Sequence, residues 1–315
     1  MKNNILKYLN ENNFISGEVL AEKLNVSRTM IWKNIKNLQN LGYDIESVKN
    51  KGYLIISRPD IPIFEEVYRN IDTEIIGKNI HYFKTIGSTN NYCKKLMKEG
   101  VSEGTIVVSD IQTQGRGRKD RFWYSPSGGL WFSTILYPEI PPQNGMLVTM
   151  TVSTSIAQAI KETTGLEPII KWPNDLLIKG RKVCGVLTEL DAEMDKINYS
   201  IVGTGINVNN KIDGEIEDIA TSLKIETGSK VSRVDLLRNI IVFFDENYKF
   251  LKSGNYGFIR ELWNSFSNIV GRKIKVVDEK KTYEGVVSDI DDSGCLILDT
   301  DSGTVRVVTG DITYL

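Results

Sequence analysis

The sequence predicts a multidomain α+β protein with three parts. These are an N-terminal winged helix–turn–helix (residues 1–60), a central α+β domain with a mixed sheet (66–268) and a small C-terminal SH3-like β-barrel (269–315). The first part reads as short helices followed by a hairpin, and the third is strands and turns. The second interleaves short strands with few helices, which favours a mixed or mainly antiparallel sheet with its helices packed on one face. A chain of 315 residues is also too long for one ordinary core.

Bulk composition excludes several classes of protein. With 25% charged residues and a net charge of −1, the chain has no general basic field. No apolar run is long enough for a membrane span or signal peptide, so we expect a cytoplasmic protein without a membrane partner. Cys93, Cys184 and Cys295 form no metal-binding or disulfide pattern. His81, the single histidine, falls in an expected strand, and we expect no histidine-based catalysis.

The N-terminal part is expected to bind DNA through its third helix. Ser27 is a candidate N-cap and Gly42 ends the helix. Ile31, Ile35 and Leu38 recur at helical spacing and should face inward. The opposite face carries the residues predicted to contact DNA, which are Ser27, Arg28, Thr29, Trp32, Lys33 and Lys36.

A hairpin and a local excess of positive charge support this interpretation. The stretch "YDIESVKNKGYLII" alternates like a hairpin, and a hairpin after a helix–turn–helix is a wing. Residues 1–57 contain eight Lys and Arg against five Asp and Glu, a net charge of +3, so the remainder carries −4. Winged helices also serve in dimerisation or protein docking, and that alternative stays open. Pro59 and Pro62 mark a linker to the next domain.

A loop rich in glycine and arginine, "QTQGRGRKDRFWYSP" (residues 112–126, the Gly-Arg loop), is the first candidate binding site. Its glycines allow backbone N–H groups to approach a ligand, its four cations suit a polyanion, and Trp123 can cover a planar ring. The loop is neither a Walker A nor a Rossmann fingerprint. A nucleotide fits these properties, although such runs are also typical of mobile segments or nucleic-acid patches.

Three further stretches bring polar groups to strand ends and turns. "GSTN" (87–90) opens an expected helix, where it either caps the helix or binds a small polar ring. Asn174 and Asp175 follow a proline and either hold magnesium or cap the turn. Lys182 enters an apolar strand, as an edge lysine or as a partner for a carboxylate or phosphate. Beyond a helix over 232–251, the tail alternates strands with "DDSG" and "DSG" turns.

Taken in order, "GSTN", "QTQGRGR", "KWPND", "RKVCGVLTE" and "VGTGINVN" resemble the biotin–protein ligase family over essentially the whole chain. The winged helix in front makes the chain similar to the family's bifunctional bacterial form. The resemblance implies a class II synthetase-like enzyme that makes biotinyl-5′-AMP from biotin and ATP with Mg²⁺. It would then transfer biotin to a lysine of the biotin carboxyl carrier protein of acetyl-CoA carboxylase. It also implies an adenylate-promoted homodimer that binds operator DNA and represses biotin synthesis genes.

The resemblance assigns roles to individual residues, but none to the metal. Biotin binding would fall to Ser88, Thr89, Asn90, Gln112, Arg116, Gly117, Arg118 and Lys182. Adenylate binding would fall to Gly115, Arg118, Arg121, Trp123, Lys171, Asn174 and Asn207. Lys182, Arg116 and Arg118 would be catalytic, since cations offset the repulsion between biotin's carboxylate and the α-phosphate. The C-terminal domain would support ATP binding and carrier docking, and a purely structural role is equally open.

The chain departs from the family pattern at Asp120, where a glycine is common. Because glycine alone reaches positive φ freely, we predict a stiffer loop and weaker adenylate retention, which Asp120→Gly should reverse. A ligand-sensing transcription factor with impaired ligase activity is the alternative, and it would need damage in the Gly-Arg loop or at Lys182. A lipoyl-ligase relative would lack both the Gly-Arg loop and the winged helix.

Overall fold

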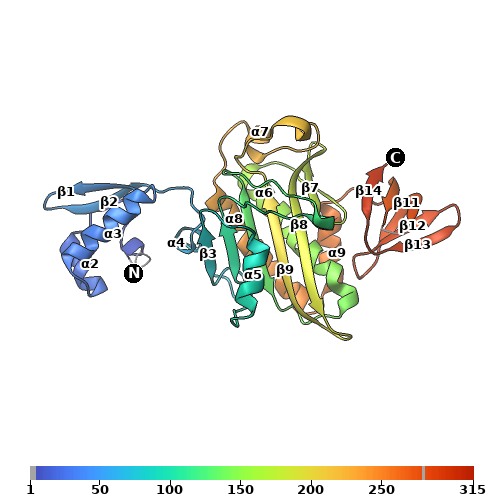
Figure 1. Cartoon of the computed structure of the whole chain (residues 1–315), viewed down its shortest axis with the longest axis horizontal. Helices are drawn as coiled ribbons and strands as arrows, with labels where there is room; N and C mark the ends of the chain where they lie inside the picture. The colour runs from blue at the N-terminus through green and yellow to red at the C-terminus, as the bar shows by residue number, and fades with distance from the viewer. Residues whose placement is uncertain (1–4, 279–280) are drawn as a thin grey trace. The chain divides into compact units, whose positions relative to one another are not determined.

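The computed structural model describes residues 5–278 and 281–315, apart from the side chains of Asp120 and Glu215. The chain divides into two compact units, Met1–Ile61 and Pro62–Leu315. The second unit contains both the central sheet and the C-terminal strands (Figure 1). Within the described ranges, no helix is both long and apolar enough to cross a membrane.

The first unit is a winged helix–turn–helix, as predicted. Its elements are α2 (Gly17–Leu24), α3 (Arg28–Asn40), β1 (Asp44–Val48) and β2 (Gly52–Ser57). The side chain of Ser27 accepts a hydrogen bond from the backbone N–H of Met30 and so caps α3. Ile31, Ile35 and Leu38 are buried in the small core of this unit. The start of the first predicted helix, before residue 5, lies outside the described residues.

A seven-stranded mixed sheet forms the centre of the second unit, in the order β3-β4-β5-β9-β8-β7-β6. Its strands are β3 (Ile80–Phe83), β4 (Ile106–Ser109), β5 (Leu130–Leu136), β6 (Ile169–Lys171), β7 (Asp175–Ile178), β8 (Arg181–Ala192) and β9 (Ile197–Ile206). β3 and β4 are parallel, and the other pairs are antiparallel. This confirms the mixed, mainly antiparallel sheet that the sequence predicts.

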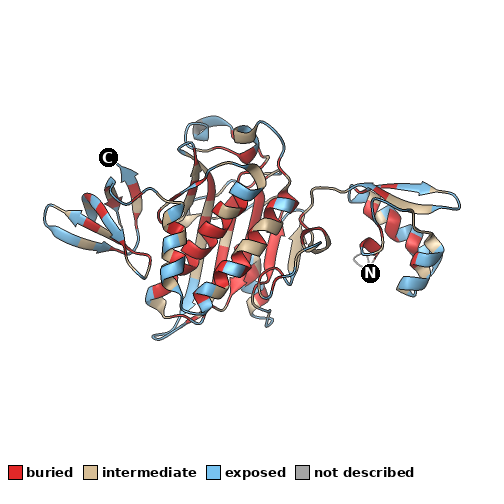
Figure 2. Ribbon diagram, turned by 180° about the vertical axis from the view of Figure 1, so that it is seen from behind, coloured by how far each residue is buried: buried red, intermediate tan, exposed pale blue. Residues whose placement is uncertain are grey.

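Helices cover both faces of this sheet, whereas the sequence predicted helices on one face. The helices are α4 (Phe64–Val67), α5 (Thr89–Met97), α6 (Gly145–Thr164), α7 (Leu223–Thr227), α8 (Arg233–Lys252) and α9 (Tyr256–Ser265). Figure 2, viewed from the side of α6 and α8, shows buried residues concentrated in these helices and in the strands behind them. α5 packs on the opposite face, where Cys93 and Leu96 meet Val107 and Ile201. Successive side chains of a strand point to opposite faces of the sheet. Strands made almost entirely of apolar residues therefore offer apolar side chains to the helices on both faces.

The C-terminal strands form a five-stranded antiparallel sheet, in the order β13-β12-β11-β10-β14. They are β10 (Lys273–Val277), β11 (Thr282–Ile290), β12 (Leu296–Thr300), β13 (Gly303–Val307) and β14 (Asp311–Tyr314). The turn between β11 and β12 is bonded to the central domain. Trp172 Nε1 donates to the carbonyl oxygen of Gly294 (3.1 Å), and Ser293 Oγ donates to Asn144 Oδ1 (3.0 Å).

Candidate functional site

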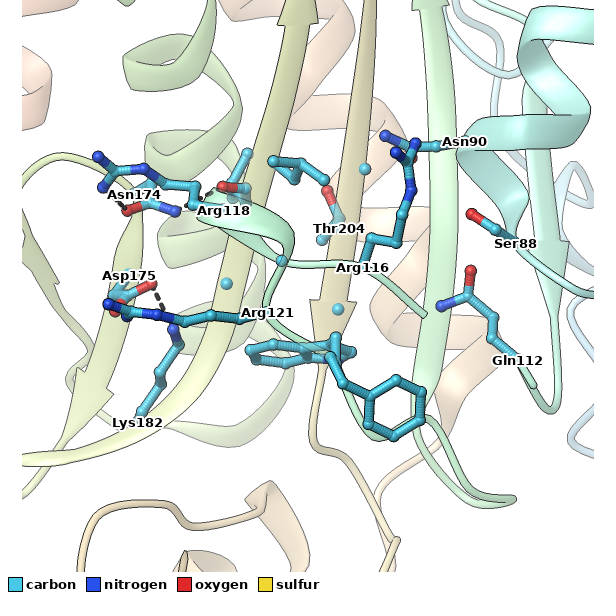
Figure 3. Close-up of a pocket in the computed structure, with 18 of the residues that line it drawn as sticks. Ser88, Asn90, Gln112, Arg116, Arg118, Arg121, Asn174, Asp175, Lys182 and Thr204 are labelled. Carbon is cyan, nitrogen blue, oxygen red and sulfur yellow. Dashed lines mark hydrogen bonds and ion pairs between the residues drawn. The ribbon is translucent and has the colours of Figure 1, made fainter. Parts of the chain in front are cut away.

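The predicted site residues gather around a cavity of about 480 Å³ in the second unit (Figure 3). The start of α5, the Gly-Arg loop, β8 and β9 line it, together with Asp311 of β14. Eleven of the predicted small-molecule-binding residues are among these lining residues: Ser88, Thr89, Asn90, Gln112, Arg116, Gly117, Arg118, Arg121, Trp123, Asn174 and Lys182. Segments spread along the sequence from Ser88 to Asp311 therefore contribute to one cavity.

Glycines on neighbouring strands give the cavity its floor. Gly203 and Gly205 alternate on β9, and Gly185 pairs with Gly205 across β8. A Cβ atom on Gly203 would lie 2.3 Å from Asn90 Oδ1, and one on Gly205 would lie 2.4 Å from Trp123 Nε1. Both distances are too short for a real Cβ atom, so any side chain at these positions would displace Asn90 or the Trp123 ring.

Uncharged polar groups occupy one end of the cavity and are oriented by one another. The backbone N–H and the hydroxyl of Thr89 both donate to Gln112 Oε1, at 2.9 and 3.0 Å. Gln112 Nε2 donates to Ser125 Oγ (3.1 Å), which fixes the direction of the amide. The buried hydroxyl of Ser133 bonds both Thr89 and Asn90. Such a pre-oriented set of donors and acceptors suits a small, neutral, hydrogen-bonding ring.

Glu189 on β8 connects this polar end to the Gly-Arg loop. Its carboxylate accepts hydrogen bonds from Asn90 Nδ2 (2.8 Å), Lys94 Nζ (2.8 Å) and the Arg116 guanidinium (3.2 Å). Burial opposes ionisation, but the hydrogen bonds from Lys94 and Asn90 and the charge of Arg116 outweigh it and lower the pKa of Glu189. Arg116 therefore points toward Asn90, away from Lys182 (Figure 3).

Cations gather at the opposite end of the cavity. Lys182 Nζ lies 2.6 Å from Asp175 Oδ1 and 5.0 Å from the centre of the Trp123 ring. Arg118 donates to Asn174 Oδ1 (3.1 Å), and Arg121 lies on the same side (Figure 3). A cavity with a neutral polar end and a cationic end suits a ligand with a hydrogen-bonding head and a phosphoryl group.

Asp311, at the start of β14, holds three cations of the Gly-Arg loop. Its carboxylate lies 3.7 Å from Arg118, 3.2 Å from Lys119 and 2.9 Å from Arg121. Partial burial would raise its pKa, but the Lys119 hydrogen bond and the three positive charges together lower it. Asp311 is therefore a carboxylate at neutral pH. The backbone of Lys119 has a positive φ of 55°. The side chain of Asp120 lies outside the described residues.

Three residues predicted to bind the adenylate lie outside the cavity lining. Gly115 pairs with Trp123 through its backbone, where a Cβ would meet the Trp123 carbonyl oxygen at 2.3 Å. Lys171 Nζ lies over the Tyr314 ring, 5.8 Å from its centre. Asn207 is buried and accepts a hydrogen bond from Asn210. Their predicted part in binding the adenylate stays a prediction.

Four residues that the sequence did not single out line the cavity or hold its lining residues: Gly203, Gly205 and Asp311 line it, and Glu189 bonds Asn90 and Arg116. Gly203 and Gly205 had a signal, because two glycines that alternate in a strand leave one face of the sheet bare. Glu189 and Asp311 had none, because their partners are distant in the sequence.

The residues considered for magnesium are already engaged with other groups. Asp175 pairs with Lys182, while Asn174 accepts from Arg118 and donates to the carbonyl oxygen of Val186. Across the described parts of the chain, no three His, Cys, Asp or Glu residues group closely enough to hold a metal ion. The protein side chains alone do not make a metal site here.

In the first unit, all six residues predicted to contact DNA are exposed. A groove beside the start of α3 is lined by Arg28, Thr29 and Trp32 from the helix and by Lys49 from the wing. Trp32 has 55% of its surface exposed, so the indole is available for contact rather than packed in the core. This arrangement of a cationic helix beside a cationic wing suits a DNA groove.

Comparisons with known proteins match all three parts of the chain. Residues 82–207 match the model of the biotin/lipoate A/B protein ligase family, residues 2–54 match an HTH domain, and residues 269–313 match the biotin protein ligase C-terminal domain. The bifunctional ligase/repressor BirA of Bacillus subtilis is 38% identical over 96% of this chain and 94% of its own length. The BirA of Escherichia coli is 27% identical over 94% of this chain and 92% of its own length.

A solved structure agrees with most of the chain. The biotin protein ligase of Aquifex aeolicus, in complex with biotin and ATP, is 33% identical and superposes with a TM-score of 0.64. The match covers 76% of this chain and 99% of the Aquifex chain. With its HTH domain, ligase domain and C-terminal domain in the same order, the chain belongs to the family of bifunctional biotin–protein ligases and repressors.

Proposed function

We propose that the chain activates biotin with ATP to form biotinyl-5′-AMP and transfers biotin to a lysine of biotin carboxyl carrier protein. One observation carries this proposal: a single cavity joins a neutral hydrogen-bonding end to a cationic end over a glycine floor. The ureido ring of biotin matches the first end, and the phosphoryl group of an adenylate matches the second. The relatives named as ligases and the neighbour solved with biotin and ATP support the same assignment.

Residues at the neutral end would orient biotin. Thr89, Asn90 and Gln112 already have fixed amide and hydroxyl directions, so a bound ring meets preorganised partners and little side-chain entropy is lost on binding. Ser88 caps α5 and places the positive end of that helix toward the cavity. Arg116 is bound to Glu189 at this end, which favours a role in positioning the loop over a direct role at the phosphate.

Residues at the cationic end would carry the chemistry. A carboxylate oxygen of biotin attacks the α-phosphorus of ATP, the bond to the β-phosphate oxygen breaks, and pyrophosphate leaves. Arg118 and Lys182 would offset the repulsion between these anions and stabilise the charge that grows on the leaving group. The lysine amine of the carrier then attacks the acyl carbon and loses a proton, and AMP departs.

We further propose that Mg²⁺ enters as the complex with ATP. Asp175 and Asn174 are engaged by cations, so the chain does not fit a preformed metal site, and the phosphates of the nucleotide would supply most of the ligands. Chelation of Mg²⁺ is therefore expected to abolish biotinylation and to leave the melting temperature of the ligand-free protein unchanged.

The first unit would make the same protein a repressor of biotin synthesis genes in the cytoplasm. The exposed cationic face of α3, the wing and the relatives named ligase/repressor support operator binding. The outer edge of β8 is paired with β7 only as far as Gly185, and in the described structure no strand covers the edge beyond it. An open strand edge suits pairing with a second copy or with the carrier. We propose that biotinyl-5′-AMP promotes a homodimer, for which the two partners would compete.

The ligase proposal is tested by incubating the protein with ATP, Mg²⁺, biotin and an apo carrier domain, and weighing the carrier by mass spectrometry. We expect a mass gain of one biotin, lost in Lys182→Ala and Arg118→Ala and retained in Lys98→Ala, which changes an exposed lysine at the end of α5. Absence of any gain with the unmodified protein would contradict ligase activity. Binding of biotin without transfer would favour the sensor-repressor alternative, with Asp120→Gly as the next variant to measure.

The repressor proposal is tested by measuring binding to operator DNA at several salt concentrations. Affinity should rise with biotinyl-5′-AMP and fall steeply with salt, since α3 and the wing would contact phosphates. Lys33→Gln and Lys36→Gln should weaken binding, whereas Lys98→Gln should not. Salt-independent binding, or none in the presence of the adenylate, would leave the winged helix as a protein-docking unit.

A further inference from the structure

Arg233, the first residue of α8, bonds both ends of the connection between β4 and β5. Its Nη1 donates to Asp110 Oδ1 (2.8 Å), just after β4, and to the carbonyl oxygen of Gly129 (3.3 Å), just before β5. The pairing of β4 with β5 runs as far as Ser109 and Trp131. Arg233 therefore links the two segments at the point where they separate to form the Gly-Arg loop.

The stability of α8 does not explain a buried arginine at this position. The N-terminus of a helix carries a partial positive charge, so a cation in its first turn is unfavourable, and burial adds the cost of removing the charge from water. Only 9% of the Arg233 surface is exposed. Ser232 already caps the helix, because its side chain accepts from the backbone N–H of Asp235. The role of Arg233 therefore lies in contacts outside its own helix, including those with Asp110 and Gly129.

Asp110 is held by two side chains from different elements. Its Oδ1 accepts from Arg233 of α8, and its Oδ2 accepts from the Tyr82 hydroxyl of β3 at 2.6 Å. Burial and the neighbouring carboxylate raise the pKa of Tyr82, so its hydroxyl stays protonated and donates at neutral pH. Because each carboxylate oxygen has its own donor, Asp110 cannot rotate or shift without losing a hydrogen bond.

The position of Asp110 sets the position of Gln112 at the neutral end of the cavity. The backbone of Gln112 is bridged to Ile86 on one side and to Ser125 on the other, and its Oε1 accepts both hydrogen bonds from Thr89. Two residues of extended chain span about 7 Å, so there is little slack between Asp110 and Gln112. A shift of Asp110 would therefore carry the Gln112 amide away from Thr89.

We propose that Arg233 is a positioning residue for biotin binding, which holds Asp110 and Gly129 and so fixes Gln112 in the orientation that receives the biotin ring. Arg233 is not among the residues that line the cavity, so its effect on biotin passes through Gln112. The part that concerns biotin rests on the proposed function, whereas the positioning of Gln112 does not.

The cationic end of the cavity has separate supports. Lys182 lies on β8, and Arg118 donates to Asn174 at 3.1 Å. Loss of Arg233 should therefore weaken the binding of biotin while the binding of ATP and the turnover rate change little. A split of this kind between the two substrates separates a positioning role from a general loss of stability.

The positioning of Gln112 is measured by hydrogen–deuterium exchange of the full-length protein. The backbone N–H of Gln112 donates to Ser125, and that of Thr113 donates to Ile86. Arg233→Met removes the cation and keeps an unbranched side chain, and we expect peptides that cover these two amides to exchange about tenfold faster, because exchange follows local opening. Exchange equal to that of the unmodified protein would overturn the proposal.

Arg238→Met is the matched control for this measurement. Arg238 is another partly buried arginine of α8, but its guanidinium bonds Asp235 and the carbonyl oxygens of residues 66 and 67. Its loss should lower the melting temperature without a specific increase of exchange at Gln112. Equal increases at Gln112 in Arg233→Met and Arg238→Met would reduce the role of Arg233 to stability and overturn the proposal. Asp110→Asn removes the same ion pair from the other side and serves if Arg233→Met fails to fold.

The consequence for biotin is measured by steady-state kinetics and by isothermal titration. Arg233→Met should raise the KM for biotin about tenfold, while kcat and the KM for ATP change by less than about twofold. Arg233→Lys returns a cation to Asp110 and should bring the KM for biotin to within about threefold of that of the unmodified protein. Faster exchange at Gln112 with an unchanged KM for biotin would overturn the role in biotin binding. If the unmodified protein bound no biotin, the proposed function would fail, and the exchange measurement would still decide whether Arg233 positions Gln112.

Discussion

Gly203→Ala tests whether the glycine floor of the cavity is needed for biotin. The added Cβ would lie 2.3 Å from Asn90 Oδ1, 3.0 Å from its Cγ and 3.1 Å from its Nδ2. Gly203 is in ordinary strand conformation, so alanine fits the backbone and the conflict is confined to the Asn90 side chain. Asn90 would have to retreat by about 1 Å to restore a van der Waals separation.

Asn90 cannot retreat without losing bonds. Its Nδ2 donates to Glu189 at 2.8 Å, and its Oδ1 accepts from the buried hydroxyl of Ser133. A hydrogen bond to a charged group contributes about 1.5–3 kcal/mol and a neutral one about 1 kcal/mol, so the displacement costs about 2.5–4 kcal/mol. If this cost falls on the bound state, biotin affinity drops about 100-fold, since about 1.4 kcal/mol corresponds to a factor of ten.

Isothermal titration of biotin into the ligand-free protein measures this loss. Gly257→Ala is the matched control, because its added methyl group meets nothing within 4 Å and should leave biotin affinity unchanged. The melting temperature of each variant shows whether the cost appears in folding instead. A Gly203→Ala protein that binds biotin within about twofold of the unmodified protein, at unchanged stability, would refute the reasoning that Asn90 is held rigidly over the sheet.

Two further predictions concern a half-buried carboxylate, Glu189, and a buried one, Asp245. Glu189→Gln keeps the shape of the side chain but removes the negative charge that pairs with Lys94 and Arg116. We therefore expect the KM for biotin to rise about tenfold, with little change in the KM for ATP. Equal changes in both KM values would contradict a local role of Glu189. Asp245 accepts from three backbone N–H groups of residues 74–76, and its pKa lies below the ordinary value because these bonds outweigh the effect of burial. Asp245→Asn should therefore cost about 2–3 kcal/mol at pH 7. Because the folded pKa is depressed, this stabilisation is present above the unfolded pKa of about 3.9 and is lost as pH falls through the folded pKa. Thermal melts of both proteins from neutral pH to pH 3 should converge, and a constant difference would be inconsistent with the charge as its cause.

Local signals made much of the fold predictable. Ser27 and Ser88 are helix N-caps in the structure, as their residue types suggested. Strand alternation identified the strands around the cavity, but not which helix would cover which face. α5 lies opposite α6 because successive residues of β4, Ile106 and Val107, face different layers and both are apolar.

The candidate site was predictable only where its residues form contiguous motifs. The "GSTN" stretch and the Gly-Arg loop both line the cavity, and each was recognisable from a few consecutive residues. Lys171 does not line the cavity, since its Nζ lies over the Tyr314 ring of the C-terminal sheet, and its role with the adenylate stays a prediction. Asp311 belongs to no motif, and only the packing of the C-terminal sheet brings it to the loop.

Each cation that lines the cavity has a carboxylate partner. Arg116 pairs with Glu189, Lys182 with Asp175, and Arg118 with Asp311. These pairs lower the repulsion that would otherwise oppose gathering so many positive charges in one partly buried place. A phosphoryl group therefore gains less binding free energy from charge alone, because the cations that it contacts already interact with carboxylates. Affinity therefore depends on the whole adenylate, whose head engages the neutral end while its phosphoryl group engages the cationic end. This division would allow the site to discriminate a biotinyl adenylate from other cellular phosphates.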